Sequence, residues 1–366
     1  MIRAAVMKEP EQKITIEEFP YPEMEDGSLT LRTIYSEVCG TDVHLHHGRL
    51  AEVPYPIIPG HVSVGRIEKI QGTVYNVHGR RFQQGELVTF YDVHDICNEC
   101  WYCLVAKATT RCPSRKVYGI TYSSNDGLLG GWSEVIYIKP GVKIVSLGED
   151  INPETFIGGG CGLLTAFHAV ERGNVRLCDT VVVQGAGPVG LSAAAWARIA
   201  GALRVYLVGA PEMRLDMARE MGADEVINIE KLNPEQRIER VKELTDGRGA
   251  DVTIECSGNP QAVAEGMRMT RDNGIYLVVG QYTDAGDISI NPHLDINKKH
   301  IDIRGCWGFD YSHIYKAVTM LKRFQKDFPW NKFISRKYTL YETNEALKAV
   351  ENFEVIKAVV EPNREG

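Results

Sequence analysis

The chain has 366 residues, enough for two domains, and its content of 44% hydrophobic and 24% charged residues is that of an ordinary globular protein. Its formal net charge of −7 argues against nucleic acid or an anionic membrane surface as the main partner. The segment Met1–Lys13 lacks the apolar run of a signal peptide, and the most apolar stretch, Val181–Ala200, is interrupted by glycines and Arg198, so we expect no membrane span. Nine cysteines without a secretion signal favour metal binding or catalysis over disulfides, in a cytoplasmic protein.

Roughly the first 150 residues contain short apolar runs that are broken by glycine and proline. Helical periodicity is scarce there, so this part is predicted to be mostly β. The expected strands are Leu29–Ile34, Val64–Ile70, Glu86–Tyr91 and Ser133–Ile138.

From Asp179 onward, apolar runs alternate with amphipathic segments. This alternation is typical of βαβ units in a doubly wound parallel sheet, so the predicted fold class is α/β. The expected strands are Thr180–Val183, Arg204–Val208, Glu225–Ile229, Asp251–Glu255 and Ile275–Val279, and the expected helices are Pro188–Ala200, Glu212–Met221, Pro234–Thr245 and Gln261–Arg271. In the tail, the expected elements are helices over Tyr311–Phe324 and Glu342–Val350 and a final strand over Lys357–Glu361.

A glycine-rich segment directly follows the first strand of this α/β part and opens a helix. In it, Gly185 permits a tight turn, Gly187 lets the backbone approach a pyrophosphate, and Gly190 lets helix and strand pack closely. Pro188 and Val189 begin the helix, whose free N–H groups lie at the positive end of the helix dipole and meet the phosphates. The segment therefore predicts a dinucleotide-binding site.

The second strand of this part ends without the acidic residue that normally holds the ribose of NAD, because Val208 is followed by Gly209. Glu212 is a candidate for the ribose contact, and Arg214 is a candidate for attracting the 2′-phosphate of NADP. Two solvated charges at the start of a helix are the alternative for both. Since no basic residue precedes Arg214 in this loop, we slightly favour NAD and leave NADP open.

Four cysteines lie within sixteen residues, separated by two, two and eight other residues. Four thiolates from one loop complete a tetrahedral shell, which is the closed arrangement of a structural zinc. An iron–sulfur cluster uses similar spacing, but the position between β segments, ahead of a nucleotide-binding part, favours zinc. The predicted ligands are Cys97, Cys100, Cys103 and Cys112.

In their order and approximate spacing, these motifs resemble those of the zinc-containing medium-chain alcohol and polyol dehydrogenases, over almost the whole chain. The resemblance implies a mostly β GroES-like catalytic domain over residues 1–160 with the zinc lobe at about 95–113, a Rossmann domain over 161–305, and a return to the catalytic domain over 306–366. Segment 44–49 is more similar to the polyol and threonine dehydrogenase branch. The further segments that carry the resemblance are Cys39-Gly-Thr41-Asp42-Val-His44, Pro59-Gly60-His61 and Glu255-Cys-Ser-Gly258.

The resemblance also implies a catalytic zinc that is held by Cys39, His61 and Cys161 and keeps one open position. This ligand set is the one known for the alcohol dehydrogenases themselves, so it comes with the resemblance and not from the spacing. Asp42 is expected to orient the ring of His61. The polyol branch usually has Glu after the zinc-binding His and often lacks the third cysteine, whereas this chain has Val62 there and retains Cys161. The expected site therefore has no carboxylate exchanging onto the metal.

By the same resemblance, Thr41 takes the alcohol proton and passes it through a ribose hydroxyl to His44. Histidine suits this exit because its unperturbed pKa is about 6.5. The basic residue that the family has just after the first ligand is Gly40 here, so the pyrophosphate is expected to depend on the helix dipole and on Lys357.

At three further positions the sequence gives only a weak indication of the residue's role. Trp132 lies where the family often places an aromatic residue of the substrate pocket, although a core tryptophan is an equal alternative. Gly258 and Gly280 are expected to line the nicotinamide side, with plain strand-end turns as the alternative.

The sequence thus predicts an NAD(P)-dependent zinc dehydrogenase that acts on a secondary alcohol, a polyol or a cyclic alcohol and binds two zinc ions per chain. The alternatives are a zinc-independent quinone or enoyl reductase, and a non-catalytic protein that binds nucleotide and zinc. Neither needs Thr41, His44 and all three catalytic-zinc ligands to be intact. The expected partners are a small alcohol or ketone and further copies of the chain, as a dimer or tetramer, with no nucleic acid and no membrane.

Overall fold

The computed structural model describes residues 1–364, and the contacts within it divide the chain into two compact units. Within the described residues, the first unit holds residues 1–160, 310–325 and 330–364. The second unit holds residues 161–309 and 326–329.

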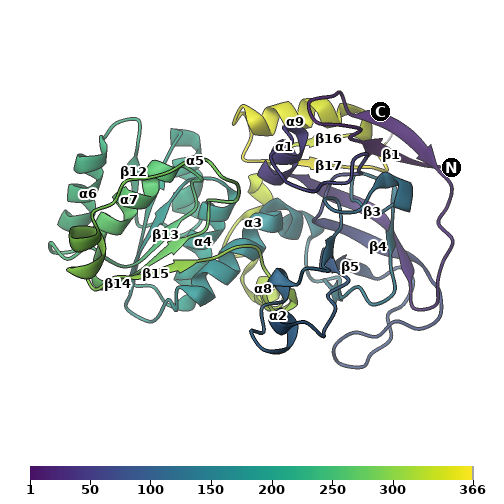
Figure 1. Ribbon diagram of the computed structural model, residues 1–366, viewed down its shortest axis with the longest axis horizontal. Coiled ribbons are helices and arrows are strands. Elements are labelled where there is room, and N and C mark those ends of the chain that lie inside the picture. The colour runs from purple at the N-terminus through teal and green to yellow at the C-terminus, as the bar shows by residue number, and fades with distance from the viewer. Residues whose placement is uncertain (365–366) are drawn as a thin grey trace. The chain divides into compact units, whose positions relative to one another are not determined.

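The first unit is mostly β (Figure 1). Its strands are β1 (Ile2–Val6), β2 (Thr15–Phe19), β3 (Leu29–Val38), β4 (Ser63–Ile70), β5 (Leu87–Phe90), β6 (Val93–His94), β7 (Lys116–Val117), β8 (Val135–Ile138), β9 (Ile144–Ser146), β16 (Ile334–Tyr338) and β17 (Lys357–Val360). The main sheet has the order β16-β17-β3-β4-β5-β9, with β8 also paired to β3, while β1 pairs with β2 and β6 with β7. Apolar side chains of β3 and β8, such as Leu29, Leu31 and Ile136, are fully buried in its core.

The helices of the first unit connect and flank these strands. They are α1 (Gly40–His46), α2 (Trp101–Leu104), α8 (Tyr311–Phe324) and α9 (Thr343–Glu351), with short 3-10 turns at Thr109–Arg111, Ser124–Asp126, Trp330–Phe333 and Leu340–Glu342. A further helix, α3 (Pro153–Arg172), is interrupted at Gly160, where φ is +52° and ψ is −140°, and its residues from Cys161 on belong to the second unit. Among residues 1–364, no helix has both the length and the apolar character that crossing a bilayer requires.

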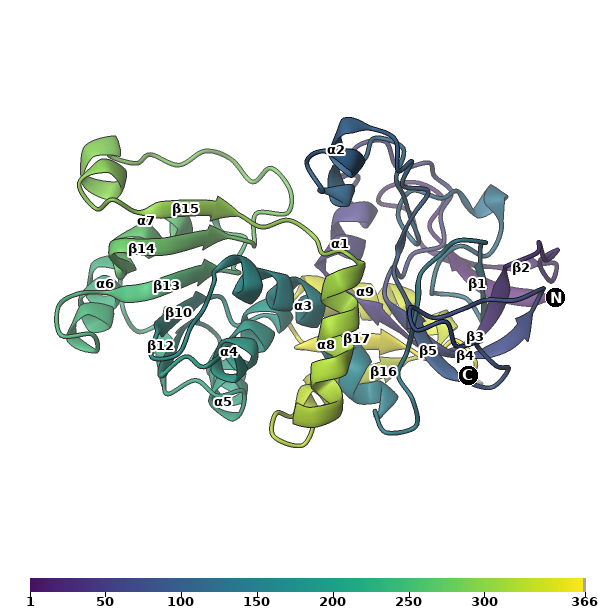
Figure 2. The ribbon, with the colours of Figure 1, turned by 90° about the horizontal axis from the view of Figure 1, so that it is seen from below.

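The second unit is a doubly wound parallel sheet with helices on both faces. Its strands are β10 (Thr180–Gln184), β11 (Arg204–Gly209), β12 (Glu225–Asn228), β13 (Ala250–Glu255), β14 (Thr270–Val278) and β15 (Asp302–Gly305), and its helices are α4 (Pro188–Ala200), α5 (Glu212–Glu220), α6 (Pro234–Glu243), α7 (Pro260–Met269) and the π-helix η3 (Pro292–Asn297). Figure 2 shows β13, β14 and β15 side by side, and the full order is β12-β11-β10-β13-β14-β15. Helices α4 and α5 pack together on one face, and α6 and α7 on the other (Figure 1). The order reverses between β10 and β13, which is the topological switch point of such a sheet, and the predicted α/β class is confirmed.

The structure differs from the sequence-based elements in places that have a physical reason. Neither α1 nor α3 is predicted, because α1 is too short to show helical periodicity and the glycine run at 158–160 disfavours a helix. The helix α7 ends at Met269 instead of Arg271, and Thr270 already belongs to β14. The buried hydroxyl of Thr270 lies 2.8 Å from that of Thr253, so this contact between neighbouring strands fixes the boundary.

Candidate functional site

Three segments that are far apart in the sequence bring their side chains to one point. Cys39 directly follows β3, His61 lies two residues before β4, and Cys161 lies in α3 directly after its break. Their donor atoms and a carboxylate oxygen of Glu37 all lie within 4.8 Å of one another. Glu37, Cys39 and His61 are buried, and Cys161 is partly exposed. Thiolates and imidazole are donors that zinc prefers, so the residues present fit a zinc ion.

Glu37 is the member of this cluster that the sequence analysis misses. Its Oε1 lies 3.5 Å from Nε2 of His61, and its Oε2 accepts a hydrogen bond of 2.6 Å from Nζ of Lys357. The exposed fractions of the Glu37 and Lys357 side chains are only 0% and 1%. A carboxylate therefore lies beside the candidate zinc donors, where the sequence motifs give no sign of one. The expectation for Lys357 is corrected, because it is buried against that carboxylate instead of being presented to a pyrophosphate.

The pairing of β3 with β17 explains why these two charges meet. Val359 lies opposite Glu37 in this antiparallel pair. Because Lys357 is two residues from Val359, it points to the same face of the sheet and lies diagonally across from Glu37. All four residues of β17 and the last four of β3 are buried, so the two charges balance each other away from water.

The glycines around Cys161 leave the room that this arrangement needs. A Cβ added at Gly160 would lie 2.0 Å from Oε2 of Glu37, and the φ of +52° at this position also favours glycine. A Cβ added at Gly162 would lie 2.9 Å from the carbonyl carbon of Pro188, which opens α4. The glycines on both sides of Cys161 are therefore required by the close approach of neighbouring groups.

Trp132 is a core residue of the first unit. It is fully buried, and its indole Nε1 donates a hydrogen bond of 3.0 Å to the carbonyl oxygen of Glu37. A Cβ added at Gly60 would lie 2.6 Å from the indole Cδ1, so the ring also packs closely against the residue before His61. Of the two alternatives for Trp132, the structure supports the core tryptophan and not the pocket residue, and the ring positions the backbone of Glu37.

The helix α1 carries the two residues that are expected to relay the proton. Thr41 and His44 are three residues apart, so they lie on the same side of the helix, and both are half-buried. Burial lowers the pKa of His44. Between them, Asp42 is fully buried, and its Oδ2 accepts a hydrogen bond of 2.8 Å from the backbone N–H of Cys39, which fixes the start of α1. Burial raises the pKa of the Asp42 carboxyl, while the charge of the neighbouring His61 opposes this rise.

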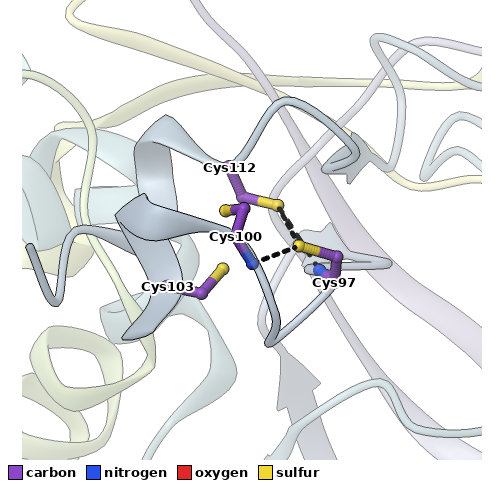
Figure 3. A group of neighbouring side chains, drawn as sticks. All are labelled: Cys97, Cys100, Cys103 and Cys112. Carbon is purple, nitrogen blue, oxygen red and sulfur yellow. Dashed lines mark hydrogen bonds between the residues drawn. The ribbon is translucent and has the colours of Figure 1, made fainter. Parts of the chain in front are cut away.

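The four cysteines of segment 97–112 converge on a second point (Figure 3). Their sulfur atoms all lie within 4.8 Å of one another. The sulfurs of Cys97 and Cys112 are 3.6 Å apart, close to the edge of about 3.8 Å in a tetrahedron with zinc–sulfur bonds of about 2.3 Å. The backbone N–H of Cys100 donates to Sγ of Cys97 over 3.3 Å. With Cys103 as the fourth donor, the cluster fits a zinc with no open position.

The glycine-rich loop after β10 has the geometry that its sequence predicts. Gly185 has a φ of +108°, which is the turn conformation that only glycine adopts readily. A Cβ added at Gly187 would meet nothing within 4 Å, so the backbone that caps α4 faces open space. A Cβ added at Gly190 would lie 1.9 Å from the carbonyl oxygen of Gly185, so helix and strand do pack closely there. Pro188 and Val189 form the first turn of α4.

The loop after β11 shows why the usual acidic residue is missing. A Cβ added at Gly209 would lie 2.8 Å from Cβ of Ala186, so close packing excludes a larger residue. Glu212 begins α5, and its carboxylate accepts a hydrogen bond of 2.8 Å from Lys231. Arg214 is only 7% exposed, and burial lowers its pKa. Arg214 is therefore not the solvated charge that the alternative interpretation assumed.

Glu255 organises the loops that follow β13 and β14. Its buried carboxylate accepts hydrogen bonds from the backbone N–H groups of Ser257 at 2.7 Å, Gly258 at 2.9 Å and Gly280 at 3.1 Å. A Cβ added at Gly280 would lie 2.5 Å from the backbone nitrogen of Gly258, so the two glycines lie against each other. Both lie at the carboxyl edge of the sheet, where the loop with Gly185 also lies.

The chain is similar to known proteins over almost its whole length. Residues 25–149 match the family model of the alcohol dehydrogenase GroES-like domain, and residues 188–323 match that of the zinc-binding dehydrogenases. The chain is 32% identical to 5-exo-hydroxycamphor dehydrogenase of Pseudomonas putida over 98% of both chains, and 29% identical to a sorbitol dehydrogenase of Halalkalibacterium halodurans over 95% of both. A solved alcohol dehydrogenase structure from Thermotoga maritima is 31% identical, with a TM-score of 0.95 over 99% of both chains.

Proposed function

The chain belongs to the zinc-containing medium-chain alcohol dehydrogenase family, and from this premise we propose which of its residues hold the metal and move the proton. As a member of this family, it is a zinc-dependent oxidoreductase that transfers hydride between an alcohol and a nicotinamide dinucleotide. The observation that carries the proposal is the convergence of Cys39, His61 and Cys161, whose donor atoms lie within 4.8 Å although the sequence separates them widely.

Cys39, His61 and Cys161 are the proposed ligands of the catalytic zinc, with Glu37 beside them. When it is bound, zinc polarises the substrate oxygen and makes the alcohol more acidic. The two thiolates balance the charge of the ion, and Lys357 balances that of Glu37 through their 2.6 Å contact. A site that is close to neutral accepts the negative charge that develops on the substrate oxygen without excessive repulsion.

Thr41 accepts the alcohol proton, and His44 passes it to solvent. The spacing of the two residues on α1 and the partial exposure of His44 support this route. Because burial lowers the pKa of His44, its imidazole is mostly neutral near pH 7 and is able to accept a proton. Asp42 does not take part in the proton transfer; its carboxylate accepts a hydrogen bond from the backbone N–H of Cys39 and so positions this proposed zinc ligand.

The second unit holds the dinucleotide, and the first unit acts on the alcohol. The open backbone at Gly187, at the N-terminus of α4, supports a pyrophosphate site there. Gly209, Glu212, Gly258 and Gly280 all lie at the carboxyl edge of the same sheet. Gly209 ends β11 and Glu212 follows it, on the adenosine side of the switch point, whereas Gly258 and Gly280 follow β13 and β14 and lie on the nicotinamide side. The chain assembles into a homodimer or homotetramer, as is common for enzymes.

We expect NAD to be used more efficiently than NADP. Glu212 places a carboxylate at the start of α5, where it repels a 2′-phosphate, and Arg214 is buried instead of being offered to one. The test is to measure kcat/KM from the absorbance of the reduced nicotinamide, with both dinucleotides and a panel of secondary, polyol and cyclic alcohols. Glu212→Gln keeps the size of the side chain and should raise the use of NADP, whereas Glu220→Gln at the other end of α5 should not.

A preference of the wild type for NADP of more than about tenfold, which equals about 1.4 kcal/mol, would contradict the assignment of NAD. The absence of turnover with every alcohol and both dinucleotides, in protein that contains zinc, would count against the proposed site as a whole.

The lobe of Cys97, Cys100, Cys103 and Cys112 holds a second, structural zinc. Cys100→Ser should lower the melting temperature and the zinc content by about one ion per chain, because the binding energy of a structural zinc keeps such a lobe folded. Elemental analysis and a thermal melting curve check this. The control is Cys178→Ser, which changes an exposed cysteine outside both clusters and should melt like the wild type. An unchanged melting curve for Cys100→Ser would refute the structural role.

A further inference from the structure

A cavity of about 830 Å³ lies in the second unit, at the amino edge of its parallel sheet. Residues from α6, from α7, from the start of β14 and from the segment of η3 line it. Gly185, Gly258 and Gly280 all follow the carboxyl ends of strands, whereas Arg248 precedes β13 and Arg271 is the second residue of β14. The cavity and the coenzyme loops therefore lie at opposite edges of the same sheet.

The wall of this cavity is strongly cationic. Within the described part of the chain, its lining includes six cations and only two acids, Asp272 and Asp295. The chain as a whole carries a net charge of −7, so the positive charge around this cavity contrasts with the negative charge of the rest of the protein. Low-dielectric concave walls with charges of one sign focus the electric field on a ligand of the opposite sign. The cations are Lys242, Arg248, Arg268, Arg271, Lys298 and Lys299.

Three of these cations are held in place by other groups of the protein. Arg271 donates a hydrogen bond of 2.6 Å from its Nε to Asp251. Arg268 lies 3.2 Å from Oδ1 of the buried Asp295, and Lys299 donates to a main-chain carbonyl oxygen. These contacts fix part of the wall before any ligand arrives, and they also engage one of the two acids of the lining.

The other three cations have little or no compensation from the chain. Among residues 1–364, no hydrogen bond or ion pair involves the ammonium groups of Lys242 and Lys298. Arg248 lies 3.4 Å from Asp246, but 71% and 89% of these two side chains are exposed, so water screens this pair. These three groups are therefore available to an anion in the cavity.

The pKa of the half-buried Lys299 depends on burial and on the charges around it. Its pKa is lowered mainly by burial; the carboxylate of Asp272 opposes this shift, and the positive charge of Lys242 adds a smaller lowering. Lys242 and Lys299 thus repel each other, and an anion bound between them would relieve that repulsion.

We propose that this cavity binds a small organic polyphosphate. Its volume lies within the range of about 300–1,000 Å³ that is typical of ligand pockets, and a single phosphate ion would fill only a small part of it. Several separated cations suit several phosphate groups, because both arginine and lysine bind phosphate oxygens well. Ile238 and Leu294 add apolar surface to the lining, which suits the organic part of such a molecule.

The test is a calorimetric titration of the full chain with adenosine triphosphate in the presence of saturating NADH, which occupies the coenzyme loops. We expect saturable binding that weakens as the salt concentration rises. Lys242→Gln/Lys298→Gln should weaken this binding about tenfold or more, because it removes two positive charges next to the ligand. Tripolyphosphate should bind less tightly than adenosine triphosphate, since it offers nothing to Ile238 and Leu294.

The matched control is Lys13→Gln/Lys326→Gln, which removes two exposed lysines outside the cavity and makes the same change in net charge. Without adenosine triphosphate, both double variants should keep the melting temperature and the NADH affinity of the wild type. If both double variants bound adenosine triphosphate equally weakly, the binding would reflect only the net charge of the protein and not the cavity, and the proposal would be overturned. An absence of binding to the NADH-saturated wild type would also overturn it. Equal affinities for adenosine triphosphate and tripolyphosphate would overturn the proposal that the ligand is organic, because they would show that Ile238 and Leu294 contribute nothing to binding.

Discussion

Cys39→Ser should abolish turnover while leaving the fold and the binding of the dinucleotide largely intact. Serine keeps the size of the side chain at the start of α1, but it replaces the proposed zinc-binding thiolate by a neutral hydroxyl. Because polarisation of the substrate oxygen by the metal contributes several kcal/mol, we expect kcat to fall by a factor of about 1,000 or more. Steady-state kinetics, a melting curve and NADH fluorescence measure the three effects separately.

The control for this variant is Cys178→Ser, which should keep both activity and zinc. Elemental analysis should find about one zinc ion less per chain in Cys39→Ser, while the lobe of Cys97 retains its own ion. If Cys39→Ser still turned over the alcohol at the wild-type rate after treatment with a chelator, the proposed catalytic zinc would have to be abandoned.

The Rossmann-type unit can be predicted from the sequence because its signals are local. Five of its strands and four of its helices are predicted from windows of a few residues, whereas β15 and the π-helix η3 are not, and the glycines after β10 follow one another at a fixed spacing. The structure gives Gly185, Gly187 and Gly190 the turn, the open backbone and the close packing expected of them. No long-range information is needed for these predictions.

The surroundings of the candidate zinc site depend on contacts that no local pattern contains. Glu37 and Lys357 are 320 residues apart in the sequence, and they meet only because β17 pairs with β3 in one particular register. The available signals were weak: Glu37 lies near the apolar end of β3, which also carries the exposed Arg32, and Lys357 precedes the apolar run of β17. Charged residues that are buried are usually paired, which favours a contact between two such charges of opposite sign. For Trp132, a substrate pocket and the core were equal alternatives, because position in the sequence does not tell a pocket residue from a core residue.

Helix α3 is missed for a related reason. Its glycines are unfavourable for a helix when they are judged alone. They are required by groups that approach from elsewhere in the chain: Glu37 Oε2 would lie 2.0 Å from a Cβ at Gly160. Intrinsic propensity is a weak guide wherever tertiary contacts decide which residue fits.

Lys357→Met should destabilise the first unit severely. Methionine fills a similar volume but removes the charge, so the carboxylate of Glu37 would remain buried without its partner at 2.6 Å. Loss of one member of a buried ion pair typically lowers the free energy of unfolding by about 3–5 kcal/mol. We therefore expect the melting temperature, measured by circular dichroism, to fall on the order of 10 °C. Glu37→Gln/Lys357→Met should recover most of this loss, because it removes both charges together.

The matched control is Lys337→Met in the adjacent strand β16. Lys337 Nζ also lies 2.6 Å from a carboxylate oxygen, that of Glu154, but 32% and 31% of these two side chains are exposed. Water screens such a pair, so it contributes only about 1 kcal/mol or less, and Lys337→Met should shift the melting temperature far less. The two contacts have the same length and differ mainly in their access to water. Equal shifts of the melting temperature for the two lysine variants would therefore show that burial is not what makes the Glu37–Lys357 pair important.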